Sequence, residues 1–292
     1  MNYGFLPSAN FNNPHKLSLS GASNLAGTGA GRTVLLYKYF EKMVGRRTVP
    51  RNQGRGSDCV GQAVARAVDV RQGVQIAGLG LPFKWVAPAC ASTVYAGARV
   101  EIGKQKYGMG TRFLGAYVPY ATQFVREIGC LYMRKYPSVD LSVHSWARSN
   151  EWGSRGVPDE LEDEARLHGI ETEIPVNSYE EYRDAICNGC PVIIGSNYGF
   201  KGQSRKGGYL KPRGTWAHAM VGTGVDDIPS RPGGLIENSW GEDWVNGDEY
   251  LDQPPGSFWV DAEVIDAMCR RGEAVAISGH EGFVQQLNYL VL

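Results

Sequence analysis

The stretch RNQGRGSDCVGQAVARAV, residues 51–68, decides how the rest of this 292-residue sequence is interpreted. Its first half is rich in Gly and predicts a loop, whereas its second half has the apolar spacing of one face of an α-helix. The apolar positions are Val60, Ala63, Val64, Ala67 and Val68. Ser57 and Asp58 lie directly before them and are candidates for the N-cap. We therefore predict a loop that leads into a packed helix beginning at Cys59.

Cys59 is the residue of this stretch that carries reactive chemistry. A helix N-terminus places partial positive charge beside a side chain and favours the thiolate, the nucleophilic form of cysteine. A thiol hydrolase further needs a His for proton transfer, a group that orients this His, and donors that face the developing oxyanion. Gln53 lies six residues before Cys59 on the Gly-rich loop, which allows its amide to fold back toward the sulfur. Cys59 and Gln53 are therefore candidate site residues.

His218 has a sequence context that the other four histidines lack. It lies inside the apolar, strand-like run WAHAMVGTGV, and Asn238 follows twenty residues later in ENSWGEDW. Two adjacent strands would bring this pair together. Taken singly, a Cys near a helix start or a His in an apolar strand is usually a packing residue. The prediction therefore depends on the four residues occurring together.

These segments resemble the papain family of cysteine peptidases. RNQGRGSDCVGQA is similar to the active-site segment of that family, in which a Gln-Gly loop precedes, by the same six residues, the Cys that opens the central helix. AHAMVGTGVD is similar to its His strand and ENSWGEDWVNG to its Asn-Ser-Trp-Gly motif, while SFWVDAEV and AVAIS resemble its closing strands. The order Cys, His, Asn agrees as well, and the resemblance covers roughly residues 48–280.

The resemblance implies a role for each matching residue. Cys59 takes the role of nucleophile and Gln53 that of oxyanion donor. His218 is the base, Asn238 orients it, and Trp240 shields their hydrogen bond from water. The implied activity is that of a cysteine peptidase, which hydrolyses peptide bonds of a peptide or protein substrate through a thioester acyl-enzyme. This reaction requires no organic cofactor and no metal.

Three positions depart from the usual pattern of the family. Gly56 stands where many secreted members carry a disulfide cysteine, and Val60 replaces the aromatic residue that usually follows the nucleophile. Both changes fit a reduced, intracellular branch that includes bacterial and bacteriophage members. Asp58 lies beside the thiol, where its charge opposes thiolate formation unless the carboxylate turns away to cap the helix.

The order of the remaining signals predicts an α+β fold. Helical patterns occur near residues 120–128, 158–167 and 178–187, the last with the capping box Ser178-x-x-Glu181. Strand patterns follow residue 190, separated by turns rich in Gly and Pro. These are PVIIGSNYGF, AHAMVGTGVD, GGLIENSW, SFWVDAEV and AVAIS. Helices followed by strands favour a fold with a helical half and a β-rich half. The resemblance implies the papain-like fold, in which these two halves flank an active-site cleft.

The domain organisation follows from the same patterns. Residues 1–48 are rich in Asn, Ser and Gly and predict an N-terminal arm, in which VLLYKYFEKMV at 34–44 fits either a short helix or a strand. Residues 49–292 form the predicted catalytic domain, with a helical half at about 49–150 and a β-rich half at about 190–280. This arm lacks the helical inhibitory propeptide pattern of the family.

Composition and charge exclude several classes of protein. The chain is 42% hydrophobic and 21% charged, which is ordinary for a globular protein. Thirty basic and thirty acidic residues cancel, so nothing indicates binding to nucleic acid or to an anionic membrane. No apolar run approaches the roughly 18 residues of a transmembrane helix, and the first residues lack the pattern of a secretory signal. We expect a cytoplasmic protein, with association to a virion as the alternative.

Six cysteines, of which two form the pair Cys187-x-x-Cys190, raise the question of disulfides or zinc. In a chain of this length without a secretory signal, reduced thiols are the expectation. A zinc site needs a second pair or clustered His, and neither is present in the sequence. We therefore expect Cys187 and Cys190 to be packing residues where a helix leads into a strand.

Two other functions remain open at the level of sequence. The site fits cleavage of peptidoglycan stems or cross-links, because other cysteine folds also use the order Cys, His, Asn. The chain also fits a structural or assembly component of a bacteriophage particle that keeps a papain-like fold and binds virion proteins through residues 1–48.

Overall fold

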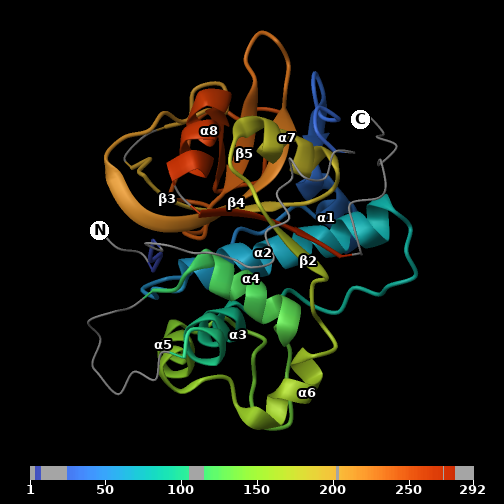
Figure 1. Cartoon of the computed structure of the whole chain (residues 1–292), viewed down its shortest axis with the longest axis vertical. Coiled ribbons are helices and arrows are strands. Elements are labelled where there is room, and N and C mark those ends of the chain that lie inside the picture. Colours follow the sequence, from blue (N-terminus) through green and yellow to red (C-terminus); the bar gives the residue numbers. More distant parts are fainter. Residues whose placement is uncertain (1–3, 8–24, 105–114, 202–203, 272, 280–292) are drawn as a thin grey trace.

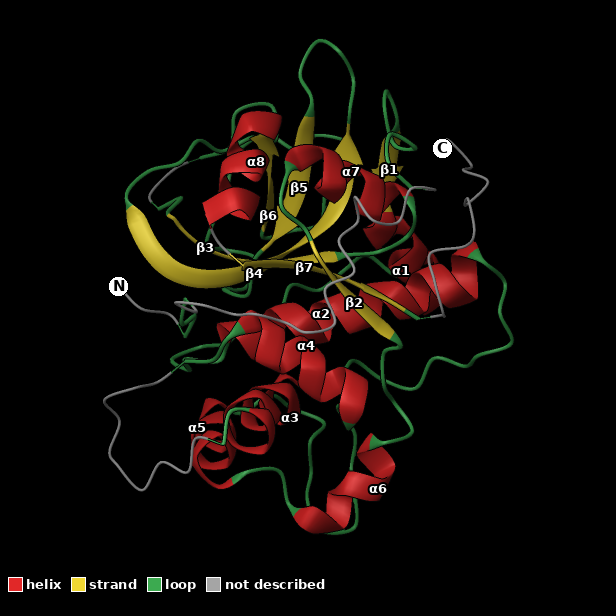
Figure 2. Ribbon diagram, in the orientation of Figure 1, coloured by secondary structure: helices red, strands yellow, loops and turns green. Residues whose placement is uncertain are grey.

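The computed structural model describes residues 4–7, 25–104, 115–201, 204–271 and 273–279, in which helices and an antiparallel sheet pack together (Figures 1 and 2). The helices are α1 (Leu36–Val44), α2 (Cys59–Gly73), α3 (Ala91–Ala96), α4 (Val118–Glu127), α5 (Trp146–Arg155), α6 (Glu162–Ala165), α7 (Tyr179–Cys187) and α8 (Ala262–Arg271). The strands are β1 (Thr33–Leu35), β2 (Thr172–Pro175), β3 (Val192–Tyr198), β4 (Thr215–Asp226), β5 (Gly233–Glu237), β6 (Ser257–Asp261) and β7 (Glu273–Ser278). The predicted α+β class is confirmed.

The described strands form one antiparallel sheet in the order β2-β7-β3-β4-β5-β6, and β1 adds to β4. Helices α7 and α8 cover one face of this sheet, while α2 and α4 cover the other (Figure 1). Helices α3 and α5 pack on the side of α2 and α4 that faces away from the sheet (Figure 2). The molecule therefore has a helical half and a β-rich half that meet along α2.

The sequence pattern alone predicts that one face of helix α2 is buried. In the structure, α2 is buried on all sides. Every residue of α2 except Gln72 is buried, because the sheet lies on one side and α3 on the other. Small residues make this close packing feasible. A Cβ atom on Gly61 would lie 2.5 Å from the carbonyl oxygen of Ala91 in α3. Helix α2 is thus the central element of the fold.

Strand β4 occupies the middle of the sheet and is buried along almost its whole length. Ala219 and Val221 face the core that contains α2, whereas Met220 and Val225 face the core beneath α7 and α8. A strand with both faces covered reads as a continuous apolar run. The predicted strands PVIIGSNYGF, AHAMVGTGVD, GGLIENSW and AVAIS are all present as β3, β4, β5 and β7.

Helix α7 shows the predicted capping signals with one change. The Ser178 hydroxyl accepts the backbone N–H of Glu181, as the capping box requires, but the Glu181 carboxylate accepts the backbone N–H of Asn177 rather than that of Ser178. Gly189 follows the helix with a φ of 78°, a left-handed conformation that favours Gly. Cys187 ends α7 and Cys190 precedes β3, both buried, where the sequence placed them.

Two predicted elements differ in the structure. The helix expected over residues 158–167 is divided into a 3-10 turn at Asp159–Leu161 and the short helix α6. The strand expected over SFWVDAEV ends at Asp261, and the segment continues as α8. Ile265, Met268 and Cys269 are buried at helical spacing in α8, so the period of this segment changes within the stretch that we interpreted as one strand.

The second part of the predicted arm joins the body of the molecule. Residues 34–44 contain both of the elements that the sequence allowed, the end of strand β1 and helix α1. In β1, Thr33 lies opposite Asp226 of β4, and α1 packs against α2. The division of the chain at residue 48 stays a prediction.

Candidate active site

Cys59 lies at the contact between the helical half and the sheet, as the first residue of α2, and is fully buried. The backbone N–H of Ala219 in β4 donates to its Sγ atom at 3.4 Å. The backbone N–H groups of Cys59 and Val60 favour its thiolate as well. The sulfur is therefore held between a helix N-terminus and the strand that carries His218, the residue directly before Ala219.

His218 and Asn238 meet because β4 pairs with β5. In this antiparallel pair Val221 lies opposite Glu237, so residues just before Val221 and just after Glu237 share one end of the ladder. His218 Nε2 lies 2.7 Å from Asn238 Oδ1, which also accepts the backbone N–H of Ser239 at 2.7 Å. Because an amide oxygen only accepts, the proton belongs to Nε2, and in the neutral imidazole Nδ1 is the acceptor.

Aromatic rings enclose the imidazole of His218. The ring of Trp240 stacks on it with centroids 4.7 Å apart and planes 30° apart, and Trp216 meets it edge-on at 5.3 Å. Trp244 packs edge-on against Trp240 and donates its indole N–H to the carbonyl of Gly256. Trp240 thus lies where the resemblance places a shield for the hydrogen bond between His218 and Asn238.

Gln53 is buried on the loop before α2 and is held at both ends of its amide. Its Nε2 atom donates to the carbonyl of Gly56 at 2.8 Å, and its Oε1 atom accepts the Ser239 hydroxyl at 2.7 Å. The Gln53 backbone N–H also donates to the Ser239 carbonyl at 2.9 Å. Ser239 therefore ties the Gln53 loop to the segment that carries Asn238. Ser239 is part of the ENSWG motif, so the sequence contained a signal for it.

Burial sets the protonation states of the two central groups. It raises the pKa of the Cys59 thiol, and the nearby Asp58 carboxylate adds to the rise, while backbone N–H groups oppose it. Burial also lowers the pKa of His218 to about 4, against the hydrogen bond to Asn238. Both shifts disfavour the charged forms because the two groups are buried. In this covered state burial therefore favours the neutral forms of the thiol and the imidazole.

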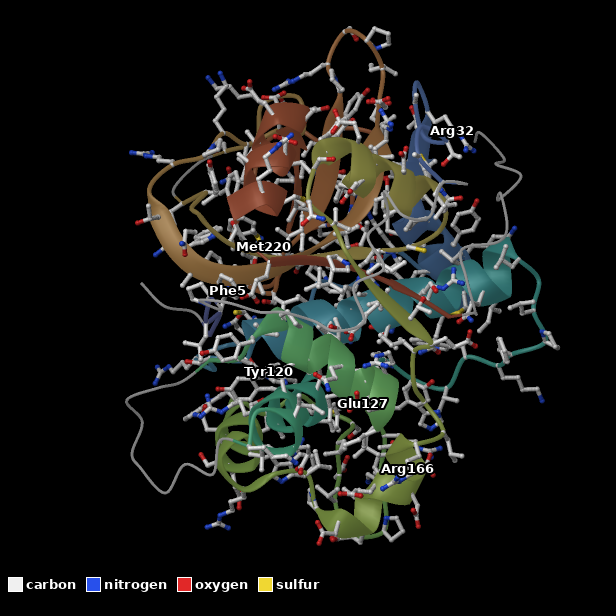
Figure 3. The ribbon with its side chains drawn as sticks, in the orientation of Figure 1. Phe5, Arg32, Tyr120, Glu127, Arg166 and Met220 are labelled. Atoms are coloured by element: carbon white, nitrogen blue, oxygen red, sulfur yellow. The ribbon has the colours of Figure 1, made fainter. Side chains whose placement is uncertain are left out.

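The described N-terminal residues lie against this site. Leu6 donates its backbone N–H to the carbonyl of Ala116, and Ala116 donates to the carbonyl of Gly4. Phe5 between them is 1% exposed and belongs to the same apolar core as Cys59. Figure 3 shows Phe5 where the sheet meets the helical half.

The fit of this segment is tight. A Cβ atom on Gly4 would lie 1.9 Å from the carbonyl oxygen of Ser57, two residues before Cys59. A Cβ atom on Gly195 of β3 would lie 2.4 Å from the ring of Phe5. The absence of side chains at Gly4 and Gly195 thus allows the segment to pack against both halves, close to the residues that precede Cys59.

Asp58 does not cap α2, which is one of the two outcomes that the sequence left open. Its buried Oδ2 atom accepts the Ser149 hydroxyl at 2.7 Å and the Gln62 amide at 3.2 Å, and lies 3.6 Å from Nε2 of His144. We call these four residues the Asp58 cluster. Sequence reasoning assigned no role to His144 or Ser149, because they lie 85 and 90 residues after Cys59 without a motif of their own.

The described residues offer no metal centre and no membrane span. No group of three or more His, Cys, Asp and Glu side chains in the described part of the chain is placed to hold a metal ion. Among the same residues, none of the helices has the length and apolar character needed to cross a bilayer.

Comparisons with known proteins identify the fold. No protein-family model and no curated protein matches the sequence. Xylellain, a cysteine protease from Xylella fastidiosa, superposes with a TM-score of 0.66 at 17% identity, over 96% of this chain and 97% of its own. Procathepsin L 3 from the Tenebrio molitor larval midgut gives 0.54 at 13% identity, over 95% and 76%. Bromelain from Ananas comosus, solved with the E64 inhibitor, gives 0.50 at 17% identity, over 85% and 99%.

These similarities confirm the papain-like fold that the sequence predicts. At such low identities they establish the fold and nothing finer. The contacts described above link His218 to Asn238 and connect the segments that carry Cys59 and Gln53 to this pair. Their catalytic roles stay predictions, as does the assignment to a bacterial or bacteriophage branch.

Proposed function

We propose that this chain is a cysteine peptidase, in which Cys59 is the nucleophile, His218 the base and Asn238 the residue that orients the base. One observation carries the proposal. The His218 imidazole is hydrogen-bonded to Asn238 at 2.7 Å, and the residue after His218 donates its N–H to the Cys59 sulfur at the N-terminus of α2. These contacts support the proposal, because nucleophilic catalysis by a thiol uses a base close to the sulfur and a third group that orients this base.

In the proposed reaction the imidazole accepts the thiol proton, and the resulting thiolate attacks the carbonyl carbon of the substrate. The Gln53 amide and the Cys59 backbone N–H donate to the oxyanion that forms. The imidazolium of His218 then protonates the leaving amine as the C–N bond breaks, which gives a thioester on Cys59. Water, deprotonated by neutral His218, attacks the thioester and releases the acid.

This reaction requires the site to open. Cys59 and His218 are both fully buried in the described structure, so a substrate reaches the sulfur only after covering residues move away. Residues 4–6 are our proposal for these covering residues, because Gly4 packs against Ser57 and Phe5 against Gly195. Entry of water and substrate also removes the desolvation that keeps the pair neutral, and this favours the thiolate–imidazolium form. The proposed enzyme is therefore more reactive in an open state than in the covered one.

The test compares the full chain with its Cys59→Ala variant on unfolded casein and on purified cell walls. We expect the wild-type chain to digest casein and the variant to be inactive on both substrates. Equal activity of the two proteins on casein would exclude the assignment of Cys59. Clearing of cell walls alone would favour the peptidoglycan-cleaving alternative, and no turnover together with a stable complex with virion proteins would favour the particle component.

A further inference from the structure

The Asp58 cluster places a buried carboxylate directly beside the proposed nucleophile. Asp58 is completely buried, and its Oδ2 atom faces Ser149, Gln62 and His144. Its Oδ1 atom has no hydrogen-bond partner within the described residues. An ionised carboxylate here opposes the formation of a second negative charge on the neighbouring sulfur. A reaction through a Cys59 thiolate therefore needs something that offsets this charge.

His144 is the group placed to offset it. Its Nε2 atom lies 3.6 Å from Asp58 Oδ2, and its ring nitrogens lie 3.3 and 3.4 Å from the Gln62 amide nitrogen. Its side chain is 20% exposed, so it can exchange protons with solvent while Asp58 cannot. His144 also forms a hydrogen bond with the Gln53 backbone. It thus contacts both the carboxylate beside the nucleophile and the loop that carries the oxyanion donor.

Helices α3 and α5 on one side and the turn at Gly56 on the other keep the Asp58 cluster in place. Ser149 lies in α5 and its hydroxyl lies 2.8 Å from that of Ser92 in α3, so the carboxylate is linked to two helices. A side chain at Gly56 would lie 2.9 Å from Asp58 Oδ1, and Gly56 accepts the Gln53 amide. The turn that holds the oxyanion donor and the buried carboxylate are therefore parts of one packed unit.

We propose that His144 is a positioning residue for the thiol chemistry, which shares one proton with Asp58 and thereby keeps the pair electrically neutral beside Cys59. The inference rests on the proposed function. A pair with one proton has no net charge whether the proton lies on the carboxylate or on the imidazole. Without His144, loss of the proton from Asp58 leaves a negative charge that nothing in the cluster balances and that repels the thiolate.

The surroundings of His144 are consistent with such a shared proton. Burial raises the pKa of Asp58 and lowers the pKa of His144, and each partner opposes the shift of the other. The positive groups that face His144 are Arg51 and Arg148, which also lower its pKa. Arg51 is engaged with Asp69 at 2.7 Å, and Arg148 binds backbone carbonyls. Asp58 is thus the negative group that acts on His144.

The test measures how fast iodoacetamide alkylates Cys59 as a function of pH in the full chain, with the modified cysteine identified by peptide mass. In His144→Gln we expect the midpoint of the profile to rise by about one pH unit, which makes alkylation about tenfold slower near neutral pH. Asp58→Asn should not slow the reaction. The double variant Asp58→Asn, His144→Gln should react within about twofold of Asp58→Asn.

The matched control is His168→Gln. His168 is a half-buried histidine that lies 3.0 Å from a carboxylate oxygen of Glu164, and its replacement should leave the profile unchanged. A His144→Gln profile equal to that of the wild type would overturn the inference alone. The inference would also fail if Cys59 in the double variant were alkylated as slowly as in His144→Gln. It would fail as well if His168→Gln shifted the midpoint of the profile as much as His144→Gln. A wild-type Cys59 that never reacts while other cysteines do would overturn both this inference and the proposed function.

Discussion

At the scale of single residues, Ser239 shows how the site is held together. Its backbone N–H binds the amide oxygen of Asn238, which also binds His218. Its hydroxyl and its carbonyl bind the side chain and the backbone of Gln53. One residue therefore holds both the group proposed to orient the base and the group proposed to face the oxyanion.

Replacement of Gln53 by Ala tests its role as oxyanion donor. We expect kcat on a peptide substrate to fall roughly 100- to 1,000-fold, because one donor to the developing oxyanion is lost. Alkylation of Cys59 by iodoacetamide forms no oxyanion and should keep its wild-type rate, which controls for misfolding. A fall in kcat of less than tenfold would show that Gln53 does not act on the transition state.

At the scale of elements, a buried ion pair joins α2 to β5. Arg66 Nε lies 2.8 Å from Glu237 Oε2, and Arg66 Nη2 lies 3.1 Å from Glu237 Oε1, which also accepts the Thr223 hydroxyl. Both charged side chains are about 93% buried. Because Glu237 directly precedes Asn238, this pair fixes the helix that begins at Cys59 relative to the strand that leads to Asn238.

The variant Arg66→Met leaves Glu237 buried without a positive partner. We expect it to lower the free energy of unfolding by about 3–5 kcal/mol, measured by urea denaturation. The matched control is Arg155→Met, since Arg155 forms an exposed pair with Glu151 on the surface of α5, and its loss should cost less than about 1 kcal/mol. Equal effects in the two variants would contradict a special role for the buried pair.

The same elements show what sequence patterns are able to predict. The helix at Cys59, the capping of α7 and most strands follow from local spacing, and the meeting of His218 with Asn238 follows once two strands are adjacent. The Asp58 cluster depends on how a loop near residue 144 packs, which no local pattern records. The segment around Phe5 likewise gave no signal. For α8, the aromatic and β-branched residues of the preceding strand β6 led us to extend the strand over residues that begin a helix.

At the scale of the whole molecule, Cys59 and His218, the proposed catalytic pair, are buried where the two halves meet. The segment Gly4–Leu6 pairs with Ala116 and places Phe5 against Gly195 of the sheet. Phe5 is therefore the side chain that links this segment to the core around Cys59. We therefore propose that opening of this contact controls whether a reagent reaches the sulfur.

Phe5→Asp should open the site, because a carboxylate is too costly to bury in this apolar contact. We expect alkylation of Cys59 by iodoacetamide to be at least about tenfold faster than in the wild type. A tenfold change corresponds to destabilising the covered state relative to the open state by roughly 1.4 kcal/mol. Phe83→Asp is the matched control, since Phe83 is 52% exposed, and its rate should not change. An unchanged rate in Phe5→Asp would mean that this segment does not limit access.

An irreversible epoxide inhibitor directed at thiols tests whether Cys59 is the reactive thiol of this chain. The intact mass of the full chain is measured after incubation, in the wild type, Phe5→Asp and Cys59→Ala. We predict a single adduct located on Cys59, formed faster in Phe5→Asp and absent from Cys59→Ala. An adduct on another cysteine, or none on Cys59 even in Phe5→Asp, would contradict it.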